Sequence, residues 1–287
     1  MKETLDMRRV FGLGLTSMAG ALAAASLLVS AGWAEPAAQP APDAVTVEWF
    51  GWSHFRFTSP NGKVILTNPF VQNPDSPIGV DDIGAADLIL VPDGHGDEVG
   101  STVEIAQKTG AQVIASGGLN SWLIERGVPQ AQVPLRFAQP GTRFVKDGIT
   151  VRLVESVHGS ELSPPTAAVP YGGVASGFFI TFENGWTVYF AGSSPLMAEQ
   201  ALWAQLYKPH MAILHMGGDH DPLDLAMQVK LLQTENPNLN TVLPHHNRVN
   251  PPPGQTTVAE VQAAIDAMGL GMRLNQPPLG QPVSYSS

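Results

Sequence analysis

Short alternating and apolar runs, separated by turn dipeptides, predict a chain rich in β-strands. Three dipeptides each join two such runs: Asn61-Gly62, Asp147-Gly148 and Asn184-Gly185. An Asn or Asp followed by Gly favours the tight turn of a two-residue hairpin, because these residues tolerate the positive φ that the turn requires. The three hairpins therefore predict sheets with antiparallel pairing.

Helical patterns interrupt the strands in four segments, and an apolar run suited to a buried strand, residues 111–116, follows the first of them. The four segments are 99–110, 119–127, 221–236 and 256–269. The third has Asp221 as an N-cap and Pro222 at the first helical position, with apolar residues three and four apart. Two hairpin-rich sheets with helices outside them form an α/β sandwich, which we predict as a single domain over residues 45–287.

The first 34 residues have the composition of an export signal. Arg8 and Arg9 precede a weakly apolar stretch that ends on small residues near Ala34. The arginine pair resembles a twin-arginine signal. A membrane anchor is the alternative, although the stretch has no strong block of Leu, Ile or Phe. We predict a cleaved signal over residues 1–34, a Pro/Ala linker over residues 35–44, and a periplasmic or secreted protein with no stable membrane anchor after cleavage.

Composition narrows the classes of function. The formal charge is −10 at pH 7, which argues against a nucleic-acid partner, because such partners require basic surfaces. Apolar residues make up 44% of the chain, enough for a sizeable core. The chain has no cysteine, so disulfides, thiolate zinc sites and cysteine nucleophiles are excluded. We expect a small-molecule substrate and a metal held by His, Asp or Glu; the sequence leaves the oligomeric state open.

Potential metal ligands or small polar residues follow five of the predicted strands. In layered α/β folds, functional sites gather where loops leave one edge of the sheets, so these loops predict one shared site. A single His or Asp is usually an ordinary hydrogen-bonding or turn residue, but the set as a whole favours metal binding. The residues are Asp93, His95, Asp97 and Glu98; His158; Ser193 and Ser194; His215, Asp219, His220 and Asp221; and His245 and His246.

Six segments in this order resemble the metallo-β-lactamase fold superfamily. The resemblance covers residues 45–247 and is greatest to the branch of ascorbate-phosphate-lactonase-like metal-dependent hydrolases. The segments are "WFGWSHFRFTSPNGKVILTNPF", "ADLILVPDGHGDEVG", "VESVHGS", "TVYFAGSS", "AILHMGGDHDPLDLAMQ" and "TVLPHHN". The resemblance implies a four-layer αββα sandwich with its active site at one edge of the paired sheets.

The family's metal ligands carry over only in part. His95, Asp97, His158 and His246 match positions that bind metal in the family. Asp93 and Glu98 stand where the family's loop has His, Ser193 replaces the Asp that usually bridges two metals, and Asn68 replaces the Asp of a "DPF" segment. Both loop replacements are competent ligands, which favours a rewired site, whereas Ser193 and Asn68 favour a site that has lost its function.

The altered ligand set predicts one or two divalent metal ions. One ion bound by Asp93, His95 and His158 is the simplest arrangement, and a second could be held by Asp97, Glu98 and His246. Zinc suits the imidazoles, whereas the added carboxylates shift the preference toward manganese or iron.

The resemblance implies hydrolysis of an ester, lactone, amide or phosphodiester by a metal-activated water. Asp97 would orient this water or accept its proton, and His220, His215 or His54 would stabilise charge or protonate the leaving group. We also expect substrate contacts from His54, His215, Asp221 and Tyr171, the last in a lid or pocket wall over residues 159–175; a plain surface loop is the alternative there. Two further functions remain open: a non-catalytic metal- or ligand-binding protein, and an iron-dependent oxidoreductase on the same fold.

Overall fold

The computed structural model describes residues 43–162, 171–234 and 236–286. All of these residues belong to one compact unit, residues 40–287. The predicted export signal and most of the predicted linker lie outside the described residues. Within the described residues, no helix is both long enough and apolar enough to cross a membrane.

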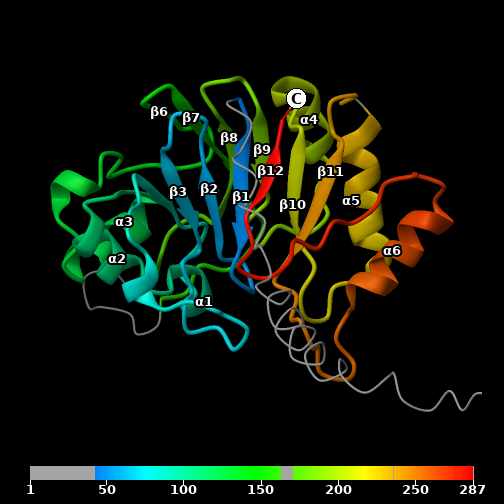
Figure 1. Ribbon diagram of the computed structural model, residues 1–287, viewed down its shortest axis with the longest axis horizontal. Coiled ribbons are helices and arrows are strands. Elements are labelled where there is room, and N and C mark those ends of the chain that lie inside the picture. The colour runs from blue at the N-terminus through cyan, green and yellow to red at the C-terminus, as the bar shows by residue number, and fades with distance from the viewer. Residues whose placement is uncertain (1–42, 163–170, 235, 287) are drawn as a thin grey trace, which may run out of the picture. The chain divides into compact units, whose positions relative to one another are not determined.

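Two six-stranded mixed sheets form the centre of the domain (Figure 1). The first has the strand order β12-β1-β2-β3-β4-β5 and the second has the order β11-β10-β9-β8-β7-β6. The strands are β1 (Val45–Trp49), β2 (Phe55–Thr58), β3 (Val64–Thr67), β4 (Leu88–Leu90), β5 (Gln112–Ile114), β6 (Arg143–Lys146), β7 (Ile149–Glu155), β8 (Ser176–Thr181), β9 (Thr187–Phe190), β10 (Met211–His215), β11 (Thr241–His245) and β12 (Val283–Tyr285).

Helices cover the outer face of each sheet (Figure 1). Their capping follows the sequence: Gly110 ends α2 in the left-handed conformation, and Thr257 begins α6 with a capping box to Glu260. The helices are α1 (Gly96–Val99), α2 (Thr102–Thr109), α3 (Gly117–Glu125), α4 (Glu199–Tyr207), α5 (Pro222–Thr234) and α6 (Val258–Ala267).

The three predicted hairpins are present, but the sheets are not purely antiparallel. The Asn61-Gly62, Asp147-Gly148 and Asn184-Gly185 turns join β2 to β3, β6 to β7 and β8 to β9. Parallel pairs join β3 to β4 and β4 to β5 in one sheet, and β9 to β10 and β10 to β11 in the other. In most of these pairs a helix connects the two strands. It returns the chain to the end of the sheet where the first strand began, so the second strand runs in the same direction.

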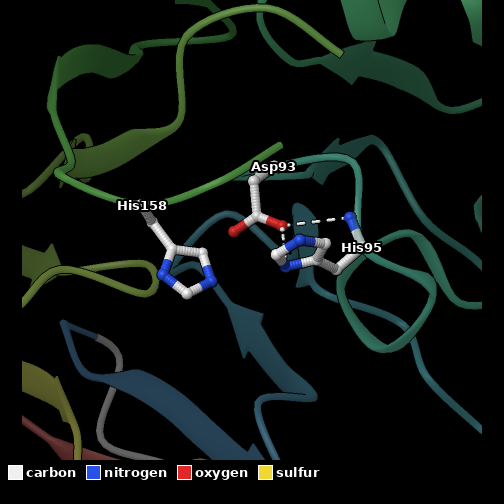
Figure 2. A group of neighbouring side chains, drawn as sticks. All are labelled: Asp93, His95 and His158. Carbon is white, nitrogen blue, oxygen red and sulfur yellow. Dashed lines mark hydrogen bonds and ion pairs between the residues drawn. The ribbon is translucent and has the colours of Figure 1, made fainter. Parts of the chain in front are cut away.

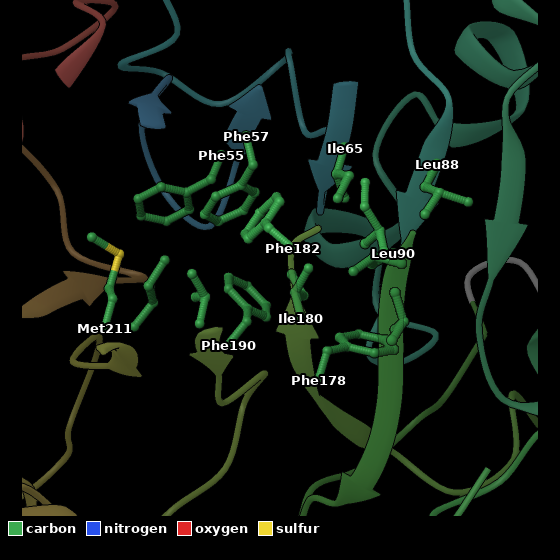
Figure 3. Packing of buried hydrophobic residues seen from close by; sticks show 14 of the residues in the cluster. Phe55, Phe57, Ile65, Leu88, Leu90, Phe178, Ile180, Phe182, Phe190 and Met211 are labelled. Carbon is green, nitrogen blue, oxygen red and sulfur yellow. The ribbon is translucent and has the colours of Figure 1, made fainter. Parts of the chain in front are cut away.

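The main core lies between the two sheets (Figure 3). Phe55 and Phe57 of the first sheet meet aromatic residues of the second: the ring centroids of Phe55 and Phe190 lie 6.3 Å apart, as do those of Phe57 and Phe182. Alternate residues of these strands point into this layer because side chains of a strand alternate between its faces. The core therefore fixes how the two sheets face each other.

Two further apolar clusters attach the helices to the outer faces. Ile105 of α2 and Leu123 of α3 pack against the first sheet, and Val229 of α5 and Ile265 of α6 pack against the second. The order is therefore helices, sheet, sheet, helices, and the predicted four-layer αββα sandwich is confirmed.

Helix α4 and strand β12 are among the elements that the sequence pattern does not predict. Helix α4 leaves Leu202 and Leu206 exposed, so its apolar positions do not form the one-sided stripe that marks an amphipathic helix. Strand β12 is only three residues long and pairs with β1, more than 230 residues earlier in the chain. Its pairing depends on a long-range contact that a local pattern does not reveal.

Phe57 provides a test of the inter-sheet core, because its side chain is fully buried. Phe57→Ala should lower the free energy of unfolding by about 3–5 kcal/mol, through lost burial and a cavity. Phe137→Ala is the matched control, since Phe137 is 81% exposed, and it should change stability by less than about 0.5 kcal/mol. Urea unfolding of both variants measures the difference; equal effects would contradict this account of the core.

Candidate active site

The candidate site lies where several strands end on the same side of the sandwich. Strands β9, β10 and β11 run parallel, so their C-terminal ends meet at one edge, where His215 ends β10 and Ser193 and His246 follow β9 and β11. Asp93 follows β4 of the other sheet and reaches the same place. The parallel pairing therefore brings together loops that are far apart in the sequence.

The first group of potential ligands consists of Asp93, His95 and His158, whose donor atoms all lie within 4.8 Å of one another. The carboxylate of Asp93 lies between the two imidazoles (Figure 2). Its Oδ1 accepts a hydrogen bond from the backbone N–H of His95 at 3.1 Å and lies 3.4 Å from Nδ1 of the same residue. The rings of His95 and His158 are nearly perpendicular, with centroids 5.1 Å apart.

The second group consists of Asp97, Glu98 and His246, and its donor atoms also lie within 4.8 Å of one another. Nε2 of His246 lies 2.8 Å from Oε1 of Glu98 and 3.4 Å from Oδ2 of Asp97. Asp97 and Glu98 belong to the single-turn helix α1, which turns both carboxylates toward the end of β11. The two groups are the two sets that the sequence predicted as ligands of one ion each.

Ser193 lies between the two groups. Its Oγ is 3.1 Å from Oδ2 of Asp93 and 3.4 Å from Oε1 of Glu98. A hydroxyl has one proton to donate, so it can serve one of these carboxylates at a time. A third carboxylate at this position would add like charge next to two buried acids, whereas the serine hydroxyl adds none.

Burial and hydrogen bonding act in opposite directions on the pKa values of the acids in this site. It raises the pKa of Asp93, and it raises the pKa of Glu98 to about 7 although the nearby His246 opposes the change. Burial also acts on Asp97, but hydrogen bonds from His246 and Trp52 outweigh it and lower the pKa of Asp97 to about 2. For His246, the carboxylates of Glu98 and Asp97 outweigh burial and raise its pKa to about 9.

The donor set fits a divalent cation. Asp93 and Glu98 are almost completely buried, and Oε2 of Glu98 has no hydrogen-bond partner among the described residues. In the described part of the chain, no Lys or Arg forms an ion pair with the acids of either group. The protonated imidazole of His246 is the cationic partner of both Asp97 and Glu98, so the two groups leave an excess of negative charge that a metal ion would offset.

Three residues that the sequence analysis missed hold the potential ligands in place. Oγ of Ser53 lies 2.5 Å from Nδ1 of His246, the indole N–H of Trp52 donates to Oδ2 of Asp97 at 2.9 Å, and Nε2 of His95 lies 2.8 Å from Oε2 of Glu161. Such contacts orient metal ligands by fixing the ring nitrogen that faces away from the metal. The segment around Trp52 and Ser53 resembles the family, but no local pattern in it indicates these contacts.

The backbone around the site adopts unfavourable conformations. Trp52 and His246 both have a left-handed φ, of 55° and 57°, and the backbone N–H of His246 donates to the carbonyl of Trp52 at 3.3 Å. A bulky residue in this region is rare and marks positions held by their surroundings. Gly217 is required beside them, because a Cβ there would lie 2.1 Å from the carbonyl oxygen of His246.

A cleft of about 220 Å³ opens beside the second group. Trp52, His215, His220 and His246 contribute to its walls. The ring centroid of His215 lies 4.2 Å from that of His246 and 4.3 Å from that of His220. Nδ1–H of His220 donates to the carbonyl of Gly217 at 2.8 Å, so Nε2 is the nitrogen of His220 that remains available.

Three other predicted substrate-binding residues have different surroundings. His54 is fully buried, its ring nitrogens have no partner among the described residues, and burial lowers its pKa to about 3. Asp221 is exposed and accepts from the backbone N–H of Leu223 at the start of α5. Tyr171 is 47% exposed, and its backbone pairs with that of Glu161 in an isolated antiparallel β-bridge. Residues 163–170 of the predicted lid lie outside the described residues.

Asn68, which replaces an Asp of the family, is also buried. Its side-chain amide has no partner among the described residues, and its φ is 44°. His54 and Asn68 directly flank Phe55 and Thr67, the last residues that β2 and β3 pair. Neither side chain takes part in the two groups of potential ligands.

Comparison with known proteins agrees with this architecture. A family model described as a β-lactamase superfamily domain matches residues 59–267. The chain belongs to the β-lactamase superfamily. The matched region includes both groups of potential ligands, and the resemblance inferred from the six sequence segments is thereby confirmed.

Relatives within the superfamily are named metal-dependent hydrolases. A UPF0173 metal-dependent hydrolase of Cupriavidus taiwanensis is 32% identical over 94% of this chain and 97% of its own length. A UPF0173 metal-dependent hydrolase of Myxococcus xanthus is 36% identical over 73% of this chain and 75% of its own. The structure of Igni18, a metallo hydrolase from Ignicoccus hospitalis, is similar with a TM-score of 0.69 and 25% identity, over 85% of this chain and 99% of that one. The chain therefore belongs to this metal-dependent hydrolase family.

Ser53 offers a test of the contacts that hold the ligands of this superfamily member. Ser53→Ala removes the nearer partner of His246 Nδ1 and leaves only His245 Nδ1 at 3.1 Å, so it should weaken metal binding about 10- to 100-fold. Ser176→Ala is the matched control, because Ser176 is also fully buried but its hydroxyl has no partner among the described residues. Metal titration of both variants gives the comparison. Unchanged affinity in Ser53→Ala would show that Ser53 does not position His246.

Proposed function

We propose that this protein is an exported metal-dependent hydrolase that acts on an ester, lactone or phosphodiester of a small molecule. The observation that supports the proposal most is the pair of ligand groups joined by Ser193 beside an open cleft. Glu98 and Asp93 are buried carboxylates, and Glu98 shares its one imidazolium partner, His246, with Asp97, so a bound cation would offset charge that the described residues leave. Their burial therefore favours a site that still binds metal over one that has lost this function.

The six residues Asp93, His95, His158, Asp97, Glu98 and His246 would hold one or two divalent ions. Zinc, manganese and iron all accept such mixed nitrogen and oxygen ligands. A bound cation supplies Lewis acidity, which lowers the pKa of a coordinated water and polarises the bond to be cleaved.

The chain's own residues divide the remaining tasks. Asp97 stays ionised, since its pKa is about 2, and its oxygens can orient the attacking water by accepting a hydrogen bond. His220 keeps Nε2 free in the wall of the cleft, because its Nδ1–H is held by Gly217, and Nε2 can hold a proton for the leaving group. Trp52 forms an apolar wall and excludes water from one side of the cleft.

Metal content tests the first part of the proposal. Protein purified from its native compartment, without chelator or an affinity tag that binds metal, should contain one or two equivalents of a divalent metal by elemental analysis. The double variant Asp93→Ala/His158→Ala should lose at least one equivalent, because it removes two ligands of the first group.

The matched control removes the same two residue types elsewhere. Asp81 is exposed, and Nδ1 of His210 accepts a hydrogen bond from the backbone N–H of Thr187, remote from the ligand groups. Asp81→Ala/His210→Ala should therefore keep its metal. Absence of stoichiometric metal from both the native protein and the control would contradict the proposal and favour a ligand-binding protein on the same fold.

Hydrolysis tests the second part. The metal-loaded protein should cleave at least one member of a panel of aryl esters, lactones and aryl phosphodiesters. Asp97→Asn, which keeps the size of the side chain, should lower kcat/KM about 100-fold or more. An Asp97→Asn protein that keeps its metal and its full activity would rule out the role given to this carboxylate.

Export rests on the sequence of residues 1–34. The mature protein should begin near residue 35, as read by mass spectrometry of the N-terminal peptide, and should be recovered from the periplasm or the medium. An intact N-terminus at Met1 in protein recovered from the cytoplasm would contradict export, without affecting the proposed hydrolysis.

A further inference from the structure

A second and larger pocket lies outside the candidate active site. It has a volume of about 560 Å³, which is in the range of pockets that bind small organic molecules. Much of its wall is apolar, with Trp49 of β1 on one side, Val249 and Pro251 on another, and Pro278 and Leu279 from the C-terminal segment. A pocket of this kind suits a ligand with an apolar body.

Arg248 is the one charged residue that lines this pocket. Its guanidinium stacks over the ring of Trp52, with Cζ 5.1 Å from the ring centroid, and its Nε is buried without a hydrogen-bond partner among the described residues. The nearby carboxylate of Asp75 accepts from the backbone N–H of Val249 at 3.2 Å and forms no ion pair with Arg248 in the described part of the chain. A buried donor without a partner is costly, so this site favours an acceptor from outside the chain.

The start of α6 adds free backbone N–H groups to the pocket wall, although the carboxylate of Glu260 caps the same turn. The capping box of Thr257 and Glu260 satisfies their own backbone N–H groups, while those of Val258 and Ala259, which line the pocket, have no hydrogen-bond acceptor among the described residues. The N-terminus of a helix attracts anions through such free N–H groups and the helix dipole.

Asn247 is a second, independent sign of a ligand. Its side chain is 7% exposed and lines the pocket. Nδ2 donates to Oε1 of Gln276 at 2.8 Å, whereas Oδ1 has no donor among the described residues. A hydroxyl or N–H group of a ligand would satisfy this oxygen.

We propose that this pocket is a second binding site, for a small organic anion with an apolar body. The carboxylate or phosphate of the ligand meets Arg248 and the start of α6, and the apolar body lies against Trp49, Val249 and Leu279. Arg248 is the one charged residue lining the pocket, and its positive charge favours anions over neutral molecules there, although the chain as a whole has a formal charge of −10.

The pocket is connected to the candidate active site through one aromatic ring. Arg248 stacks on Trp52, and the indole N–H of Trp52 donates to Asp97. Hydrolysis of an ester or lactone releases acids of the class that the pocket fits. This connection to the reaction rests on the proposed function, whereas binding in the pocket does not.

Calorimetric titration of the intact, metal-loaded protein tests the second site. Octanoate and octyl phosphate are the anionic probes, and octan-1-ol is the neutral probe of equal chain length. We expect at least one anion to bind at this site. The affinity of octan-1-ol should be lower than that of this anion by about tenfold or more. Comparing the two anions distinguishes a carboxylate site from a phosphate site.

Variants separate this pocket from the metal ligands, which also attract anions. Arg248→Gln should weaken anion binding about tenfold or more, and Arg273→Gln, which removes an exposed arginine paired with Asp266, should leave it unchanged. Ala259→Trp narrows the pocket from an exposed position on α6 and should weaken binding by a similar factor even if Arg248→Gln does not fold.

Two results would overturn the proposal. One is the absence of measurable binding of both anions to the native protein. The other is anion binding that persists unchanged in both Arg248→Gln and Ala259→Trp, which would assign it to the metal or to another surface. Because no arm measures catalysis, these results are independent of whether the protein proves to be a hydrolase.

Discussion

Two carboxylates, Asp93 and Glu98, are buried within reach of a single serine hydroxyl, and the rest of the site is arranged around this constraint. Like charges cannot be buried together without protons, cationic partners or a metal ion. The surrounding residues answer this requirement with imidazoles from separate loops, and His246 is drawn toward Glu98 and Asp97. Ser193 keeps a further negative charge out of the centre. The carboxylates that replace the family's His at positions 93 and 98 therefore fit together with the uncharged serine that replaces its Asp at position 193.

The inter-sheet core makes this arrangement possible. Phe55, Phe57, Phe182 and Phe190 hold the two sheets face to face, so a loop of one sheet can meet loops of the other at a common edge. Asp93 comes from the first sheet and Ser193 from the second, and their contact spans the sandwich. Close packing resists small displacements, which keeps such contacts within hydrogen-bonding distance.

Backbone strain and ring contacts connect the two pockets. Trp52 has a left-handed φ, donates to Asp97, contacts His246 and lies beneath Arg248. Trp52 therefore lines the cleft and also contacts Arg248, which lines the larger pocket. A bulky residue is held in this conformation only where its surroundings compensate the cost, which places Trp52 among the residues on which the site depends.

The sequence alone determined the hairpins, most helices and the position of the potential ligands at strand ends, because these follow from local alternation, turn dipeptides and capping residues. Through the family resemblance it also predicted the two groups of potential ligands, whose side chains the structure brings together. The tertiary structure alone decided the parallel pairs, the strand β12, and the roles of Ser53, Trp52 and Glu161. Ser53 and His246 are separated by 193 positions, and serine is common in loops, so no local pattern marks their contact. Such partners are chosen by packing, which brings distant segments together only in the folded chain.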